Sequence, residues 1–262
     1  MLEPADSNLL IEERRRRICD LLREQGRVTV EALATRFGTS QVTIRADLSA
    51  LDSLGALTRT HGGALRRAED MDQPLGVKQL QHHAEKVRIA VAACALIREG
   101  ETIILDSGTT TAEIARCMRA VDFKSVNVIT NALNVAALLM DVPSVRLIMP
   151  GGILRRESNS LSGHMADAAM ANLQADRLYL GADGLDPEIG VMTPHLPEAE
   201  LNAQMIRMSR QVVVVADSSK LMRRNISLIA KVEQIHMLIT DRAAPAQVVE
   251  ELRQRGVEVR LV

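Results

Sequence analysis

The chain has 262 residues, enough for one large or two modest domains. Hydrophobic residues make up 47% and charged residues 25%, and the formal net charge is -1. This composition is typical of a folded globular protein and excludes disordered, collagen-like and uniformly basic chains. The longest apolar run has nine residues, about half of what a membrane span needs, and the first residues lack a secretory signal. We therefore expect a cytoplasmic protein without a membrane span.

Cysteine, histidine and aromatic residues exclude further classes. Cys19, Cys94 and Cys117 form no CxxC pair and no cluster with histidine, so we expect three small buried hydrophobic side chains. His82 and His83 also lack partners at ligand spacing, and no metal is expected. With three aromatic residues and no Trp, the chain has no set of rings on which unpaired bases could stack.

The charge is unevenly distributed along the chain. Residues 11–68 contain 11 arginines and seven carboxylates, a net charge of +4, whereas the rest carries -5. A basic segment attached to an acidic body indicates nucleic-acid contact by the N-terminal part. Residues 69–76 are polar, with Pro and Gly, as in a linker. We predict a DNA-binding domain over 12–68, a linker over 69–83 and a second domain over 84–262.

Helical periodicity predicts three helices in the N-terminal domain. Ile18, Leu21 and Leu22 recur at helical spacing before Gly26, and residues 31–37 form a second short helix that ends at a glycine. The arginines at positions 14 to 17 fit either a solvated helix end or phosphate contacts.

The third helix follows Ser40, a favourable N-cap, and buries Ile44, Leu48 and Leu51. The opposite face carries short or polar side chains that fit a major groove. Two extended pieces around Gly62 and Gly63 then form a basic hairpin, which completes a winged helix-turn-helix. The predicted DNA contacts are Ser40, Gln41, Thr43, Arg45 and Ala46 from the helix and Arg59 and His61 from the wing.

The second domain alternates short apolar runs with helical patterns, which predicts an α/β fold with a mainly parallel sheet. The expected helices span residues 111–119, 132–140, 198–209 and 245–255. The expected strands span residues 102–105, 126–129, 145–148, 177–180, 212–215, 236–239 and 257–262.

Small and polar residues follow these strands, and ligands of such sheets bind beyond the carboxyl ends of the strands. The candidate ligand-binding residues are Asp106, Ser107, Gly108, Thr109, Thr110, Thr111, Thr130, Asn131, Gly151, Gly152, Asp183, Glu198 and Lys220.

The segment Asp106–Thr111 ends a strand and opens a helix, so its backbone N–H groups and hydroxyls suit a phosphate. It lacks the GxxxxGK[ST] and GxGxxG patterns, so neither ATP nor NAD is indicated. An ordinary helix N-cap explains the same residues. Lys220 is either the cation opposite the phosphate or a surface lysine.

Carboxylates near the predicted site have two functional interpretations. Asp183, Glu198 and Glu200 could bind sugar hydroxyls, or Asp183 could act as a general base beside Lys220 in an aldose–ketose isomerisation. Glu198 and Glu200 also fit the solvated face of a helix. His195, in a polar loop, could line the site.

The motifs resemble those of the DeoR family of bacterial sugar-catabolism repressors. The resemblance rests on Thr43–Leu48 and Arg59–Ala64, and on the strand-end motifs of the second domain. It covers about residues 14–262, and Ala46 stands where the family has a second basic residue. The segment Thr193–Met205 looks most like members that control amino-sugar or galactitol-type pathways.

The resemblance implies a sensor domain similar in fold to ribose-5-phosphate isomerase. It further implies a homo-oligomeric repressor, a dimer or tetramer, that binds double-stranded operator DNA and releases it on binding a phosphorylated sugar, with no cofactor. Residues 185–197 contain no lysine, which favours binding without catalysis. An active sugar-phosphate isomerase or deaminase with an accessory DNA-binding domain is the alternative. A third hypothesis is a purely structural oligomerisation partner, which would bind neither DNA nor ligand.

Overall fold

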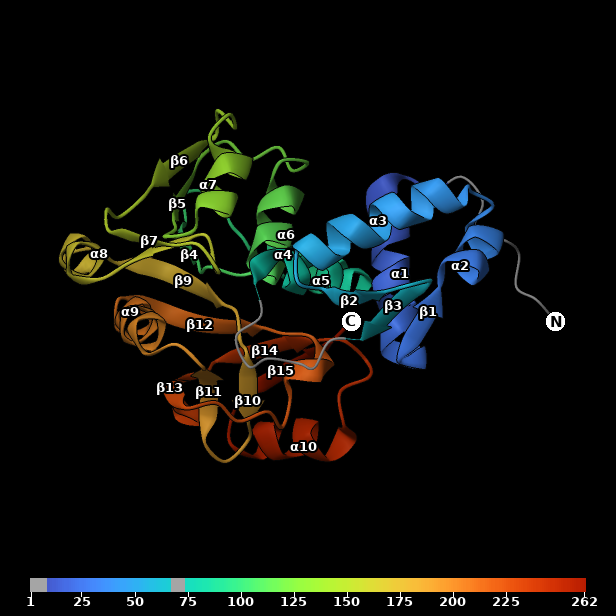
Figure 1. The fold of residues 1–262 in the computed structure, drawn as a ribbon. Helices are drawn as coiled ribbons and strands as arrows, with labels where there is room; N and C mark the ends of the chain where they lie inside the picture. Colours follow the sequence, from blue (N-terminus) through green and yellow to red (C-terminus); the bar gives the residue numbers. More distant parts are fainter. Residues whose placement is uncertain (1–8, 67–73) are drawn as a thin grey trace. The chain divides into compact units, whose positions relative to one another are not determined.

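The computed structural model describes residues 9–66 and 74–262 (Figure 1). Its chain divides into two compact units, residues 1–83 and 84–262. None of the helices within the described ranges is long and apolar enough to cross a membrane.

The N-terminal unit packs three helices against a small antiparallel sheet with strand order β1-β3-β2. Left-handed glycines, Gly26 and Gly38, end the first two helices, and Ile44, Leu48 and Leu51 are buried in the shared core. The predicted winged helix-turn-helix is confirmed. Its elements are α1 (Ile11–Gln25), β1 (Arg27–Thr29), α2 (Val30–Phe37), α3 (Gln41–Ser53), β2 (Leu57–Thr60) and β3 (Gly63–Arg66).

A further helix, α4 (Leu75–Leu80), lies inside the segment 69–83 that the sequence predicts as a linker. Leu75 and Val77 are buried, and Leu80 packs against the core of the N-terminal unit. The linker prediction is therefore wrong for residues 75–80, because these apolar side chains stabilise a helix too short to show a period in the sequence. The remaining linker residues 69–73 lie outside the described ranges.

The second unit contains a seven-stranded sheet in which every neighbouring pair of strands is parallel. This confirms the predicted α/β domain with a parallel sheet. In spatial order the strands are β15 (Glu258–Leu261), β14 (Met237–Thr240), β12 (Ser209–Val215), β9 (Ala175–Leu180), β4 (Thr102–Leu105), β5 (Val126–Ile129) and β6 (Val145–Ile148).

Helices cover both faces of this sheet, and alternate residues of each strand enter two separate cores. On β4, for example, Ile103 and Leu105 face one layer and Ile104 faces the other. One layer contains α5 (His83–Cys94), α6 (Thr109–Met118) and α7 (Leu133–Leu139). The other contains α8 (His164–Met170), α9 (Leu196–Arg207) and α10 (Ala246–Gln254).

Several short elements were not predicted from the sequence. Two form a hairpin, β7 (Ile153–Arg155) with β8 (Ser160–Ser162). Three form a small antiparallel sheet, β10 (Gly184–Asp186), β11 (Gly190–Thr193) and β13 (Ser227–Ala230). Two single turns are η1 (Ser218–Lys220) and η2 (Val232–Gln234). These strands of three or four residues carry Gly, Ser or a charged residue in place of an apolar run, so only their packing reveals them.

The cysteines differ in burial. Cys19 and Cys94 are buried, as predicted, but Cys117 is only half-buried, so the prediction of three buried cysteines is wrong for that residue. Burial, followed by the neighbouring Cys117, raises the pKa of the Cys94 thiol to about 12.

Candidate functional site

The exposed face of α3 carries the residues predicted to contact DNA. Ser40 is its N-cap, and its hydroxyl accepts a hydrogen bond from the backbone N–H of Thr43 at 3.1 Å. Gln41, Arg45 and Ala46 are exposed, and the Arg45 guanidinium donates to the Gln41 amide oxygen at 3.0 Å. This pair presents adjacent donors and acceptors on one face, which suits base edges in a major groove.

An exposed valine was missed by the sequence analysis. Val42, on α3, is 72% exposed. Its position next to Gln41 was visible in the sequence, but an apolar residue in an amphipathic pattern is assigned to the core by default. An apolar side chain on this face is chemically suited to the methyl group of thymine.

The wing is linked to α3 through Arg59. Its guanidinium donates to the Ser49 hydroxyl at 2.6 Å, and its backbone N–H donates to Asp52 at 3.3 Å. His61 lies exposed in the two-residue turn between β2 and β3. At Gly63 an added Cβ would lie 2.0 Å from the Val28 carbonyl oxygen, so only glycine allows β3 to approach β1 this closely.

Two arginines of α1 hold α3 in place. The carboxylate of Asp47, only 3% exposed, accepts from Arg14 Nε at 2.6 Å and from Arg15 Nε at 2.9 Å. Arg16 instead pairs with Glu12 at 3.7 Å. The run of arginines was expected to form a solvated helix end or to contact phosphates. This expectation is wrong for Arg14, which is buried and pairs with Asp47, joining α1 to α3.

The second unit has a topological switch point between β4 and β9. From β4 the chain runs outward through β5 to β6, and from β9 it runs outward in the opposite direction through β12 and β14 to β15. Ligands of open parallel sheets bind beyond the carboxyl ends of the strands at such a point. Asp106 follows β4 and Gly181 follows β9, and Asp106 Oδ2 accepts from the Gly181 N–H at 3.1 Å.

Asp106 is a buried carboxyl group at this switch point. Its Oδ1 accepts from the Ser107 N–H at 2.5 Å. Burial raises the pKa of Asp106 to about 7, because the desolvation of the charged form outweighs the hydrogen bonds from Ser107 and Gly181, and the nearby Asp183 adds to the increase. A carboxyl group in this environment gains and loses its proton near neutral pH.

The turn after Asp106 leads into α6. Thr111 is fully buried, and its hydroxyl donates to the carbonyl oxygens of Asp106 at 2.7 Å and Gly108 at 3.1 Å. Thr111 thus shapes the turn through its side chain. Thr109 and Thr110 occupy the first turn of α6, where backbone N–H groups lack partners within the helix.

The loops after β5 and β6 meet through the β7–β8 hairpin. Asn131 donates from Nδ2 to the Leu161 carbonyl oxygen at 3.1 Å, whereas its Oδ1 is buried without a partner among the described residues. The Thr130 hydroxyl accepts from the Ala132 N–H. Gly152 has a φ of 138°, and an added Cβ would lie 2.8 Å from the Ser162 carbonyl oxygen. Gly151 has room for a side chain by the same measure.

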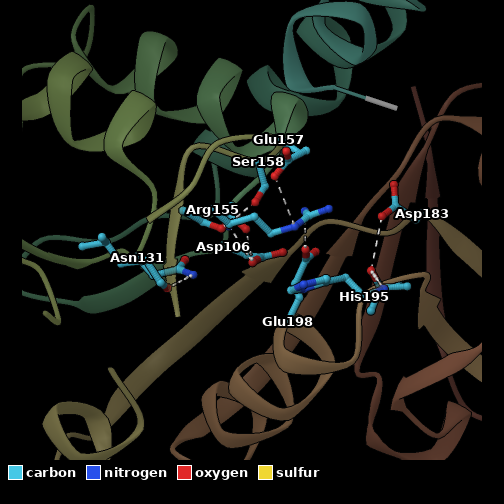
Figure 2. A network of polar contacts seen from close by, with 12 residues as sticks. Asp106, Asn131, Arg155, Glu157, Ser158, Asp183, His195 and Glu198 are labelled. Atoms are coloured by element: carbon cyan, nitrogen blue, oxygen red, sulfur yellow. Dashed lines mark hydrogen bonds and ion pairs between the residues drawn. The ribbon is translucent and has the colours of Figure 1, made fainter. Parts of the chain in front are cut away.

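Arg155, at the end of β7, extends across this edge, as Figure 2 shows. Its guanidinium lies 3.5 Å from Glu198 Oε2 and 3.9 Å from Glu157 Oε2. The sequence analysis missed Arg155, since 43 residues separate it from Glu198. Glu198 is half-buried and faces the site, whereas Glu200 is exposed, as expected for a solvated helix face.

Asp183 and His195 both form a hydrogen bond with Thr193, and the two residues are close to each other (Figure 2). The Thr193 hydroxyl donates to Asp183 Oδ2 at 3.4 Å and accepts from the His195 N–H at 3.5 Å. The structure thus brings Asp106, Asn131, Asp183 and Glu198 to one region. Within the described ranges, no group of three or more His, Cys, Asp or Glu side chains is arranged to hold a metal ion.

Lys220 lies on η1, after β12, which pairs with β9 and not with β4. The segment is held by Asp241, whose carboxylate accepts from the Ser218 N–H at 2.6 Å and from its hydroxyl at 2.9 Å. Lys220 therefore stands at the same edge of the sheet, two strands from the turn after β4. Its role as the partner of a phosphate stays a prediction.

Comparisons with known proteins agree with the division of the chain into two units, residues 1–83 and 84–262. The family model of the DeoR-like helix-turn-helix domain matches residues 14–69, and that of the DeoR C-terminal sensor domain matches residues 81–242. A protein of Escherichia coli O157:H7 described as an aga operon transcriptional repressor is 42% identical, covering 95% of this chain and 93% of that protein. The HTH-type transcriptional regulator GlpR of Haloferax volcanii is 36% identical, covering 96% of this chain and 98% of that protein.

A solved structure, ribose 5-phosphate isomerase A from Methanocaldococcus jannaschii, is 18% identical and covers 54% of this chain and 56% of its own, with a TM-score of 0.39. A similarity this low supports no argument about activity. The two family models, by contrast, match both units, and the relatives extend over nearly the whole chain. The chain belongs to the DeoR family of transcriptional regulators.

Proposed function

We propose that this protein represses a carbohydrate-utilisation operon by binding double-stranded operator DNA, and that a phosphorylated sugar releases it. The family membership and the names of the relatives support regulation of transcription. The contacts with DNA are assigned to the exposed face of α3 and to the wing. Arg45 reads a base edge, because it is exposed opposite the buried Ile44 and Leu48, and Arg59 contacts a phosphate from the wing.

The effector site is assigned to the switch point between β4 and β9. The observation that supports this assignment is the hydrogen bond from the Gly181 N–H to Asp106, because it joins the ends of β4 and β9 at the edge of the sheet where ligands of parallel sheets bind. The phosphate binds at Thr109 and Thr110, where the helix N-terminus favours an anion, and Lys220 supplies a positive charge. Protonation of Asp106 near neutral pH reduces its repulsion of the phosphate.

The remaining polar residues at this edge bind the sugar. Asn131, Asp183 and Glu198 offer amide and carboxylate groups that form hydrogen bonds with hydroxyls. The protein acts as a homo-oligomer, a dimer or tetramer, because helix-turn-helix repressors read two half-sites with a two-fold symmetric assembly. The effector alters DNA affinity by binding one arrangement of the oligomer more tightly than another.

A sugar-phosphate isomerase or deaminase is the second candidate, favoured by the titratable groups Asp106, Asp183 and His195 in one region. Against catalysis, residues 185–197 contribute β10 and β11 to a small sheet and contain no lysine that could polarise a substrate. We therefore assign ligand binding without turnover to this site.

One experiment separates these functions. The full-length protein is titrated onto an operator selected from random duplexes, with and without members of a phosphosugar panel, while the same compounds are assayed for conversion. Release of the operator without conversion supports the repressor. Conversion that disappears in an Asp183→Asn variant supports the enzyme instead.

A further inference from the structure

A buried asparagine on α9 has no role in the assignments made so far. Asn202 is 1% exposed, and neither its amide oxygen nor its amide nitrogen has a hydrogen-bond partner among the described residues. Its buried neighbours on the helix, Ala199, Met205 and Ile206, belong to the apolar core under the sheet. Leaving both groups of a buried amide unpaired destabilises a fold, so such a residue calls for a polar partner that comes from elsewhere.

Helix geometry places this amide one turn of α9 from Glu198. Asn202 follows Glu198 by four residues, so the two side chains lie on the same face of α9, one turn apart. Glu198 in turn faces Arg155 across the edge of the sheet, as seen in Figure 2. Asn202 therefore lies one helical turn from the carboxylate that pairs with Arg155.

The ion pair between Arg155 and Glu198 is long. Its N–O distance of 3.5 Å exceeds the roughly 2.7–2.9 Å of a tight charge-assisted hydrogen bond, and Glu157 competes for the same guanidinium at 3.9 Å. A ligand that offers hydroxyl groups to both ends of the pair can replace this contact, because guanidinium donates and carboxylate accepts.

A second amide with an unpaired atom contacts β8. The Oδ1 atom of Asn131 is buried without a partner among the described residues, while its Nδ2 is fixed to Leu161 of β8. Helix α9 packs against the same strand. Two amides with unused hydrogen-bonding groups thus belong to segments that contact β8, the loop after β5 and helix α9.

We propose that Asn202 and Arg155 complete the effector site as a subsite for the polyhydroxylated end of a sugar phosphate, the end far from the phosphate. Adjacent hydroxyls of the carbon chain separate Arg155 from Glu198, bind to both, and reach the two amide groups of Asn202. The inference rests on the proposed function. It adds that the protein selects its effector by chain length, since one hydroxyl-bearing end must span from the α6 turn to α9.

The test uses full-length protein and calorimetric titration with three kinds of probe: inorganic phosphate, glycerol 3-phosphate, and a panel of six-carbon sugar and sugar-alcohol phosphates. For the wild type we expect the tightest binding among the six-carbon compounds. Asn202→Leu should weaken the binding of the best six-carbon compound by about tenfold or more, and the binding of inorganic phosphate by less than about twofold. Equal affinity of variant and wild type for the six-carbon compound would overturn the inference.

Stability measurements keep this result interpretable. Asn202→Leu keeps the branched shape and removes the unpaired amide, so its thermal midpoint should stay the same or rise. Asn202→Ala provides a second variant in case the larger methyl groups of leucine overpack the core. Loss of binding with a retained midpoint supports the subsite, whereas a raised midpoint with unchanged binding identifies Asn202 as an ordinary core residue and overturns it.

Glu198→Gln and Glu157→Gln form a matched pair for the ion pair. Both remove one carboxylate beside Arg155 and keep the shape of the side chain, but only Glu198 lies on the face of Asn202. We expect Glu198→Gln to weaken the binding of the six-carbon compound about tenfold and Glu157→Gln to leave its affinity unchanged. Equal losses in both variants would contradict the subsite. If the wild type binds none of the phosphate compounds, the proposed function fails together with this inference.

Discussion

Asp106 Oδ2 accepts a hydrogen bond from the backbone N–H of Gly181, which joins the ends of β4 and β9, the two strands at the switch point. These residues are 75 positions apart in the chain. The bond fixes the spacing between the turn that opens α6 and the loop that carries Asp183. A buried carboxyl group therefore sets the geometry of the candidate effector site.

The raised pKa of Asp106 predicts a pH-dependent stability. Its pKa is about 7 in the folded protein and 3.8 in a model compound, so the folded state holds a proton that the unfolded state releases between about pH 4 and 7. The free energy of unfolding should therefore fall as pH rises through this window, by at most about 1.4 kcal/mol per pH unit.

Asp106→Asn should remove this component of the pH dependence. Urea unfolding of variant and wild type at pH 5, 6, 7 and 8 gives the difference between them, in which the titration of other groups cancels. We expect the variant to gain stability relative to the wild type as the pH rises. A difference that stays constant from pH 5 to 8 would show that Asp106 titrates normally.

Asp47 is predicted to stabilise the N-terminal unit. Asp47→Asn leaves Arg14, which is 10% exposed, without its charged partner, and breaking a buried pair on one side typically costs about 3–5 kcal/mol. Chemical unfolding of the full chain should show a transition at lower denaturant for this unit. Glu12→Gln is the control, since Glu12 is 82% exposed, and it should change the stability by less than about 1 kcal/mol. Similar effects of both substitutions would contradict the role of Asp47.

The strands and the polar residues at their ends could be predicted because seven short apolar runs alternate with helical patterns, which is typical of a parallel sheet. Once the strands are parallel, Asp106, Asn131, Gly151 and Asp183 must stand at one edge. Periodicity likewise identified the buried face of α3, because Ile44, Leu48 and Leu51 repeat at helical spacing.

The residues missed at the site depend on contacts that no local pattern encodes. Arg155 belongs to a three-residue strand, and its contact with Glu198 arises only when β7 and α9 come together in the folded domain. Asn202 lies among apolar residues on a helix, where its polarity gives no sign of which direction it faces. Both require tertiary structure for their interpretation.

Arg45 is predicted to determine sequence preference and Arg59 to determine general affinity. On an operator selected from random duplexes, Arg45→Ala should cost about 1–3 kcal/mol and relax the preference at one base pair. Arg59→Ala should weaken operator and random DNA alike and lower the slope of affinity against salt by about one. Fluorescence anisotropy measures both. Equal losses of Arg45→Ala on operator and random DNA would exclude base reading by this residue.

The phosphate position is tested by adding a charge to the first turn of α6. Thr110→Asp places a carboxylate where the phosphate is assigned, so repulsion should abolish effector binding and leave the winged domain folded and bound to its operator. Thr110→Asn has nearly the same side-chain shape as Thr110→Asp but carries no charge. The effector should still release this variant from the operator, at up to about tenfold higher effector concentration. Operator release is followed by anisotropy during titration with the best phosphosugar of the panel. If the effector concentration that releases the wild type from the operator also releases the Thr110→Asp variant, the phosphate lies elsewhere on the sheet edge.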